Sequence, residues 1–232
     1  MPELDWASLT TRVDPEPSLV LVTGGLALAA VAVDRVWLRA RNVVTIVHEA
    51  GHAVAAKLTG RRLTGIRLHS DTSGLTASVG RPYGPGMVFT MAAGYVSPSL
   101  VGLMGVVLLV YDQVTLMLWG ATAVLLSMLT LIRNLYGALL LVSVGVVVGA
   151  ISLYADPDVQ AAFGYGVTWF MLLGAVRPVG ELQRQRRNGS VGVVSDADQL
   201  ARLTRIPGTI WVGLFGAATV SALVAGGWLL LA

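Results

Sequence analysis

The chain has 232 residues, of which 55% are hydrophobic and 12% charged, and its mean hydropathy is +0.72. These values lie far from those of soluble globular proteins and predict a polytopic membrane protein. The net charge of +3 is small and no basic stripe interleaved with aromatics occurs, so nucleic-acid binding is not expected; the lack of cysteine excludes disulfides and thiolate metal ligands.

The N-terminal segment is acidic. Its first 17 residues contain Glu3, Asp5, Asp14 and Glu16 against a single Arg12, whereas a secretory signal peptide begins with basic residues. We therefore expect this segment to be retained in the protein.

Seven apolar runs approach or exceed the length of about 20 residues that a helix needs to cross a bilayer. They cover residues 18 to 34, 42 to 59, 85 to 110, 114 to 132, 136 to 154, 159 to 177 and 208 to 231. The second run is short and the third contains Pro98, so we expect about 5–7 transmembrane helices.

Positive charges predict the orientation of these spans. If the spans alternate, 13 of the 16 Lys and Arg residues lie on the side of the N-terminus, and only Arg35, Arg39 and Arg41 lie on the other. Because cytoplasmic loops are enriched in Lys and Arg, this bias predicts a cytoplasmic N-terminus in the cell membrane.

The second run contains the string HEAGH, formed by His48, Glu49 and His52. Residues i and i+4 of a helix share one face, so the two imidazoles can bind one Zn²⁺ while Glu49 reaches a water molecule there. An ionisable side chain within a membrane span indicates a functional site by default. With the predicted orientation, this site lies within the membrane towards the cytoplasmic side.

Residues 63 to 80, LTGIRLHSDTSGLTASVG, alternate apolar and polar residues around a turn-like SDTSG, a pattern that predicts a β-hairpin. The unpaired edges of this hairpin must be covered by protein, water or an extended peptide. Cover by an extended peptide would be β-strand addition, in which the peptide pairs with the edge of a sheet. In the next span, Gly94, Ser97, Gly102 and Gly105 predict close helix packing. Arg133 and Asn134, at the end of a later span, could orient a substrate or stabilise an oxyanion.

Catalytic zinc usually has three protein ligands, and HEAGH supplies two of them. The third must come from His69, Asp71, Glu181, Asp196, Asp198 or the carboxylates on the other side of the membrane. Asp196 and Asp198 follow Ser195, which predicts an N-cap on a short helix, so both could equally be residues that stabilise the helix start.

These strings together resemble the site-2 protease family of intramembrane zinc metalloproteases, specifically its small bacterial branch. The resemblance rests on HEAGHAVAAKLTGRRLTGIRLHSDTSGLTAS, AAGYVSPSLVG, IRNLYG and SDADQLARLTRIP, and it covers most of residues 42 to 210. It implies one Zn²⁺ per chain with His48, His52 and Asp196 as metal ligands and Glu49 as catalytic acid and base. Better-known members carry the ligand Asp in an Asp-Gly string that is missing here, so Asp198 remains an alternative.

The resemblance further implies an endopeptidase that cleaves a transmembrane or membrane-proximal segment of a protein substrate, as in regulated intramembrane proteolysis. The expected partners are a substrate helix and the lipid bilayer. We expect one integral membrane domain, 1–232, with an N-terminal segment and first span in 1–41, a catalytic core in 42–210 and a last span at 208–231. The fold class is all-α and polytopic, with a membrane-associated β-hairpin between the HExxH helix and the next span.

A non-proteolytic zinc-binding scaffold or sensor, or a transporter, is the alternative. A transporter should distribute further ionisable residues through its other spans, and these are absent apart from Asp34 near the end of the first span. A scaffold would tolerate the loss of Glu49, which this chain retains.

Overall fold

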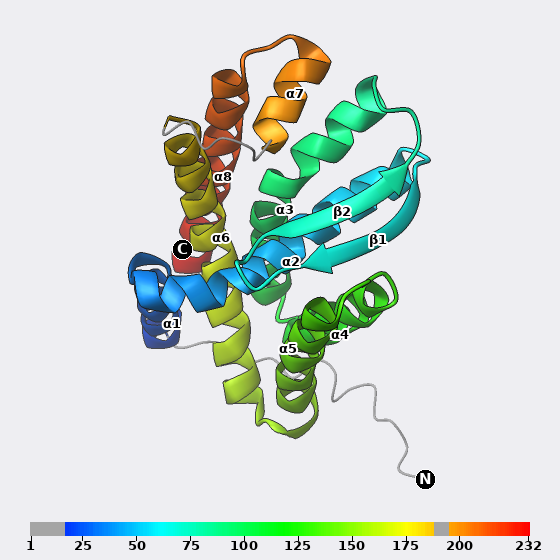
Figure 1. Ribbon diagram of the computed structural model, residues 1–232. Coiled ribbons are helices and arrows are strands. Elements are labelled where there is room, and N and C mark those ends of the chain that lie inside the picture. Colours follow the sequence, from blue (N-terminus) through cyan, green and yellow to red (C-terminus); the bar gives the residue numbers. More distant parts are fainter. Residues whose placement is uncertain (1–16, 188–194) are drawn as a thin grey trace.

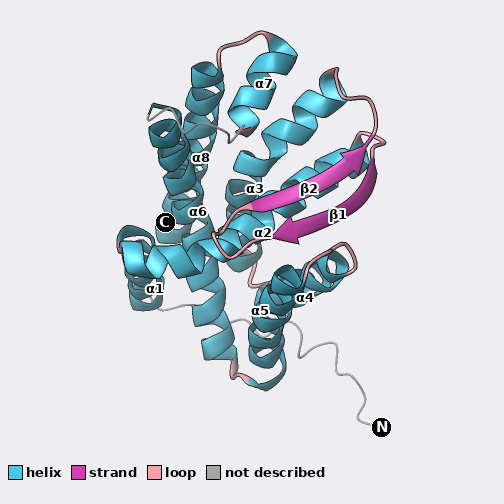
Figure 2. Ribbon diagram, viewed as in Figure 1, coloured by secondary structure: helices cyan, strands magenta, loops and turns pink. Residues whose placement is uncertain are grey.

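The computed structural model describes residues 17–187 and 195–232, which form eight helices and one two-stranded antiparallel sheet (Figure 1, Figure 2). The helices are α1 (Pro17–Ala32), α2 (Asp34–Leu58), α3 (Pro85–Val110), α4 (Val114–Leu129), α5 (Leu135–Tyr154), α6 (Pro157–Arg187), α7 (Asp196–Thr204) and α8 (Gly208–Leu231); the strands are β1 (Arg62–Leu68) and β2 (Gly74–Val79). The predicted all-α polytopic class with a small hairpin is confirmed. The acidic segment before residue 17, with its predicted cytoplasmic position, lies outside the described residues.

Four helices of the described chain, α3, α5, α6 and α8, are each long and apolar enough to cross a membrane. Helices α1 and α2 pass this test only together and are bent by 103° at the break between them, and α4 has only 16 residues. The described residues therefore hold four candidate spans, or five if the bent pair is one span, and the count of five lies at the lower end of the predicted range. Two predicted spans, 18 to 34 and 42 to 59, count as one because α1 and α2 form a bent pair.

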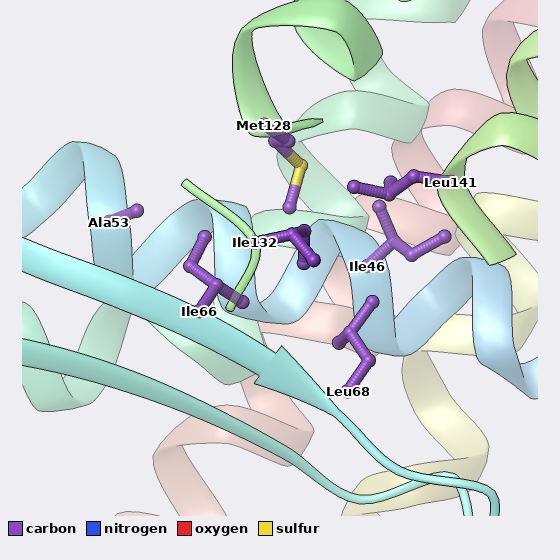
Figure 3. Close-up of a cluster of buried hydrophobic side chains, with 7 residues drawn as sticks. All are labelled: Ile46, Ala53, Ile66, Leu68, Met128, Ile132 and Leu141. Carbon is purple, nitrogen blue, oxygen red and sulfur yellow. The ribbon is translucent and has the colours of Figure 1, made fainter. Parts of the chain in front are cut away.

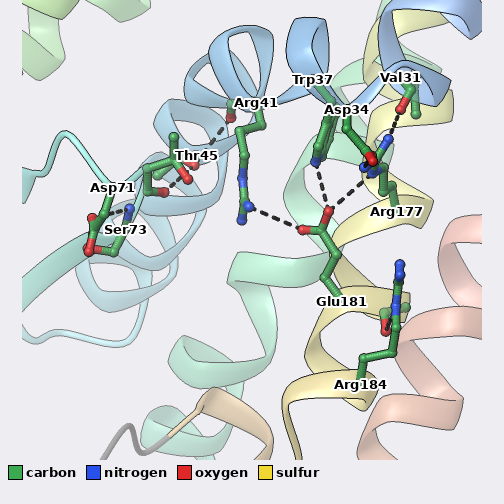
Figure 4. A network of polar contacts seen from close by, with 12 residues as sticks. Val31, Asp34, Trp37, Arg41, Thr45, Asp71, Ser73, Arg177, Glu181 and Arg184 are labelled. Atoms are coloured by element: carbon green, nitrogen blue, oxygen red, sulfur yellow. Dashed lines mark hydrogen bonds and ion pairs between the residues drawn. The ribbon is translucent and has the colours of Figure 1, made fainter. Parts of the chain in front are cut away.

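A cluster of charged residues surrounds the bend. Arg177 of α6 donates to the carbonyl oxygen of Val31 at the end of α1 and pairs with Asp34, the first residue of α2 (Figure 4). Glu181, one turn further along α6, accepts a hydrogen bond from Trp37 Nε1 at 2.8 Å. Because Arg177 satisfies a carbonyl oxygen that has no partner within α1, the chain can end one helix and start the next in a new direction.

Small residues let α3 pack closely between α2 and α6, as the sequence predicts. A Cβ atom built on Gly51 of α2 would lie 2.6 Å from Ser97 Cβ of α3. On another face of α3, a Cβ on Gly102 would lie 2.8 Å from Leu172 Cδ2 of α6. The helix continues through Pro98 to Val110 without a break. Consequently α2 crosses the bundle against α3, and in Figure 1 it runs across the direction of α5, α6 and α8.

The hairpin packs on α2 through its apolar face. Strands β1 and β2 pair in antiparallel register, with Arg62 opposite Val79 and Leu68 opposite Gly74. The buried cluster beneath them joins β1 to α2 and to the α4–α5 region; it consists of Ile46, Ala53, Ile66, Leu68, Met128, Ile132 and Leu141 (Figure 3). Burial of these side chains keeps the hairpin parallel to the helix that carries HEAGH.

The segment between α4 and α5 covers the outer edge of β1. The amide of Ile66 donates to Leu131 O at 2.8 Å, and the amide of Arg133 donates to Ile66 O at 2.9 Å. Asn134 accepts from the amide of Leu68 at 3.2 Å through Oδ1 and donates to its carbonyl oxygen at 2.6 Å through Nδ2. Arg133 and Asn134 therefore bind β1 rather than lining the cavity described below, which corrects the sequence-based hypothesis. The outer edge of β2 pairs with no other described strand.

Candidate metal centre and active site

His48 and His52 lie one turn apart on α2, as the HEAGH spacing predicts, and their Nε2 atoms are 3.0 Å apart. Asp196, the first residue of α7, approaches the same point from the far end of the chain. Its Oδ2 lies 3.2 Å from Nε2 of His48 and 3.2 Å from Nε2 of His52. The three side chains are the one group of three His, Asp or Glu residues in the described chain whose donor atoms converge in this way.

This triangle fits a tetrahedral metal ion. Ligand atoms at about 2.0 to 2.2 Å from such an ion lie about 3.3 to 3.6 Å from one another, close to the separations of His48, His52 and Asp196. Burial alone would raise the pKa of the Asp196 carboxyl, but the adjacent His48 and His52 lower it, and the net shift is downward. The carboxyl is therefore ionised, as a metal ligand must be.

Helix α3 orients the histidines from behind. His52 Nδ1 lies 2.7 Å from Thr90 O, an acceptor that keeps the proton on Nδ1 and directs Nε2 towards the cluster. The backbone of α3 passes so close that a Cβ on Gly94 would lie 2.6 Å from His48 Nε2. Thr90 and Gly94 therefore belong to the site, although their sequence pattern indicates only ordinary helix packing.

Asp196 reaches the cluster because the start of α7 is held in place. Ser195 and Asp198 form a reciprocal capping box, in which the amide of Asp198 donates to Ser195 Oγ at 3.2 Å and the amide of Ser195 donates to Asp198 Oδ2 at 3.2 Å. Arg186 of α6 pairs with the other oxygen of Asp198. Burial would raise the pKa of Asp198, but the bonds from Ser195 and the charge of Arg186 hold it below its usual range.

The other sequence candidates for the third ligand have different partners. His69 and Asp71 stay in the hairpin turn, where both contact Ser73. Glu181 is held by Trp37, Arg177 and Arg41 in the cluster at the bend (Figure 4). Asp198 is engaged in the helix cap. Among the candidates in the described chain, only Asp196 meets the two histidines.

Glu49 is buried, with 3% of its surface exposed, and faces β2. Thr76 Oγ1 lies 2.6 Å from Glu49 Oε2 and 3.1 Å from its carbonyl oxygen. A Cβ on Gly74 would lie 2.5 Å from Glu49 Cγ, so glycine is needed where β2 passes the carboxylate. The sequence did not predict Thr76 as a site residue. The alternation of residues in β2 predicts the face of the strand on which Thr76 lies, but not that Thr76 contacts Glu49 of α2.

A cavity of about 620 Å³ opens onto this site. His48, Glu49, His52 and Asp196 line it, together with β2 on one side and residues of α3 and α6 on the other. It is large enough for several residues of an extended peptide, and β2 contributes all of its residues to the wall.

Comparison with known protein families matches residues 21–226 to the family described as Peptidase M50B-like. The match spans α2, the hairpin and α7, and hence every residue of the cluster. No curated protein and no solved structure matches the chain.

Proposed function

Because the chain belongs to the Peptidase M50B-like family, we propose that it is a zinc-dependent intramembrane endopeptidase that cleaves a transmembrane or membrane-proximal segment of a protein substrate. The family makes it a membrane metallopeptidase; the endopeptidase activity, the zinc ion and the substrate class are our inference. The observation that carries this proposal is the convergence of Asp196 on His48 and His52 beside the buried Glu49.

His48, His52 and Asp196 would hold the metal ion. Two imidazoles and one carboxylate suit Zn²⁺, and a bound zinc ion lowers the pKa of water and polarises a carbonyl group. The same donor set does not suit Ca²⁺ or Mg²⁺, which prefer oxygen ligands.

Glu49 would move the proton. Its carboxylate lies next to the cluster on the same helix, where it can accept a proton from the attacking water and return it to the leaving nitrogen. Thr76 holds one carboxylate oxygen by a hydrogen bond of 2.6 Å, so the side chain is oriented before a substrate arrives. The net reaction adds one water across the amide: hydroxide joins the carbonyl carbon, and the nitrogen takes up the proton as the C–N bond breaks.

The free edge of β2 would bind the substrate as an extended strand. A peptide bond inside a helix is shielded by its own hydrogen bonds, so the substrate must unwind before cleavage. Since the segment 131 to 134 already covers the β1 edge, an added strand can pair only with β2, whose residues line the cavity. This arrangement leads the substrate backbone past Glu49.

The test is a comparison of wild type with Glu49→Gln. Membranes from cells that produce either protein are analysed for new protein N-termini within predicted spans, and purified samples are analysed for zinc. We expect equal zinc content, with N-termini that appear only in wild type. Identical sets of N-termini would refute the proteolytic role and favour the scaffold, sensor or transporter alternative.

A further inference from the structure

Tyr95 is the aromatic residue of α3 that follows Gly94 and lines the cavity together with His48, Glu49, His52 and Asp196. Nothing in the proposed chemistry uses it so far. Gly94 is the residue of α3 that lies against both histidines, so the side chain of the adjacent Tyr95 lines the cavity beside His48 and His52.

The ring of Tyr95 is held rigidly from two sides. It meets the His48 ring edge to face, with centroids 4.9 Å apart and planes at 89°. It stacks on Phe215 of α8 with centroids 5.0 Å apart and planes at 17°, and Phe215 is itself buried. Such aromatic pairs contribute about 0.5–1.5 kcal/mol beyond the burial of their area, so the ring keeps its orientation without a substrate.

Tyr95 is half-buried in the cavity wall, and its hydroxyl group makes no hydrogen bond to a residue that the structure describes. Tyr95 lines the cavity together with Arg41, Glu49 and Asp196, so its side chain lies among polar groups there. At neutral pH a tyrosine hydroxyl carries its proton and can donate a hydrogen bond. The cavity thus presents a hydrogen-bond donor that no acceptor within residues 17–187 and 195–232 satisfies.

We propose that Tyr95 is a catalytic residue whose hydroxyl donates a hydrogen bond to the oxygen of the scissile carbonyl. This inference rests on the proposed function. When the oxygen of water bonds to the carbonyl carbon, the π electrons of the C=O bond move onto the carbonyl oxygen. They return to the C=O bond as the C–N bond breaks. A preorganised donor stabilises the oxygen at the moment when it carries this charge, which lowers the barrier without strengthening the binding of the intact substrate.

The ring alone could have a structural role, because it packs on His48. The two roles are separated by Tyr95→Phe, which keeps both ring contacts and removes only the hydroxyl. Tyr95→Leu removes the ring contacts too, and it should lower zinc content by loosening His48. If the role of Tyr95 is purely structural, Tyr95→Phe should keep the zinc content and the activity that Tyr95→Leu loses.

The experiment uses the purified full chain in detergent with zinc, fluorescein-labelled casein as an unfolded substrate, and a phosphinic analogue of a casein cleavage-site peptide. For Tyr95→Phe we expect kcat to fall about 100-fold, as for the loss of an oxyanion-hole donor, with KM and zinc content unchanged. The affinity for the tetrahedral analogue should fall by a similar factor, while the affinity for the cleaved peptide stays the same. Tyr111→Phe, an exposed tyrosine just beyond the end of α3, is the matched control and should behave as wild type.

Wild-type kcat and analogue affinity in Tyr95→Phe would overturn this role for Tyr95 and leave the proposed function intact. A wild-type protein that cleaves nothing in a Glu49-dependent manner would overturn the proposed function and this role together.

Discussion

Replacing Gly94 with alanine should destroy the metal site while leaving the fold in place. A Cβ at this position would lie 2.6 Å from His48 Nε2 and closer still to His52 Nε2, whereas ordinary contacts begin at 3.4 Å. The rings would have to retreat by at least about 0.8 Å, more than the roughly 0.5 Å within which a functional constellation must be held. The loss of zinc affinity should therefore exceed the about 10- to 100-fold that follows from removing an outer hydrogen-bond partner.

The fold should survive this substitution because two effects on stability oppose each other. Alanine is favoured over glycine inside a helix by about 1 kcal/mol, and an extra methyl in a packed interior costs about 1–3 kcal/mol. We therefore expect a loss of at most about 2 kcal/mol in the free energy of unfolding. That change is small beside the loss of the site.

The assay measures zinc per chain by elemental mass spectrometry after equilibration with zinc, together with the thermal unfolding midpoint in detergent. Gly166→Ala in α6 is the control, because a Cβ there meets no atom within 4 Å. It should retain full zinc content. A Gly94→Ala protein with the zinc content of wild type would show that α3 does not press against the histidines and would refute the reasoning.

Three further predictions concern the third ligand, the hairpin and the orientation. Asp196→Ala should abolish zinc binding, whereas Asp198→Ala should keep it and destabilise the start of α7 by about 0.5–2 kcal/mol; the reverse zinc contents would reassign the ligand. Asn134→Ala removes two hydrogen bonds to Leu68 of β1, each worth about 0.5–1.5 kcal/mol. Amide hydrogen exchange in the hairpin should therefore accelerate. Unchanged exchange would show that Asn134 does not hold β1 in place. Because the chain has no cysteine, single cysteines introduced at the two ends of α6 can report its orientation. Arg184→Cys should react with a membrane-impermeant reagent added on the cytoplasmic side, and Asp158→Cys with the same reagent added outside. The opposite labelling would contradict the predicted topology.

Much of the candidate site could be predicted because three of its residues are close neighbours in the sequence. His48, Glu49 and His52 are bound to share a helix face by the helical repeat alone, and the apolar runs and the alternation of the hairpin predict their elements for the same reason. The capping signal at Ser195 is local too, and it predicted the start of α7 that the structure contains. Sequence periodicity thus determined the elements and two members of the cluster.

Tertiary packing decided which acidic residue joins them. Asp196 and Asp198 lie in the same short helix, and the sequence left both open as ligands; one reaches His48 and His52 because Arg186 and Ser195 bind the other. The bend between α1 and α2 likewise depends on Arg177, which is remote in sequence from both helices. No local pattern encodes such contacts.

By itself, then, the sequence determined a helical membrane protein with two histidines on one face of a helix, because hydropathy and helical periodicity are properties of neighbouring residues. Only the tertiary structure decided that Asp196 completes the cluster, that residues 131–134 cover one hairpin edge while the other edge meets no further strand of the described chain, and that Tyr95 lines the cavity. Each of these depends on the packing of elements distant along the chain, where closeness in space is set by the burial of whole helix faces and not by the order of residues.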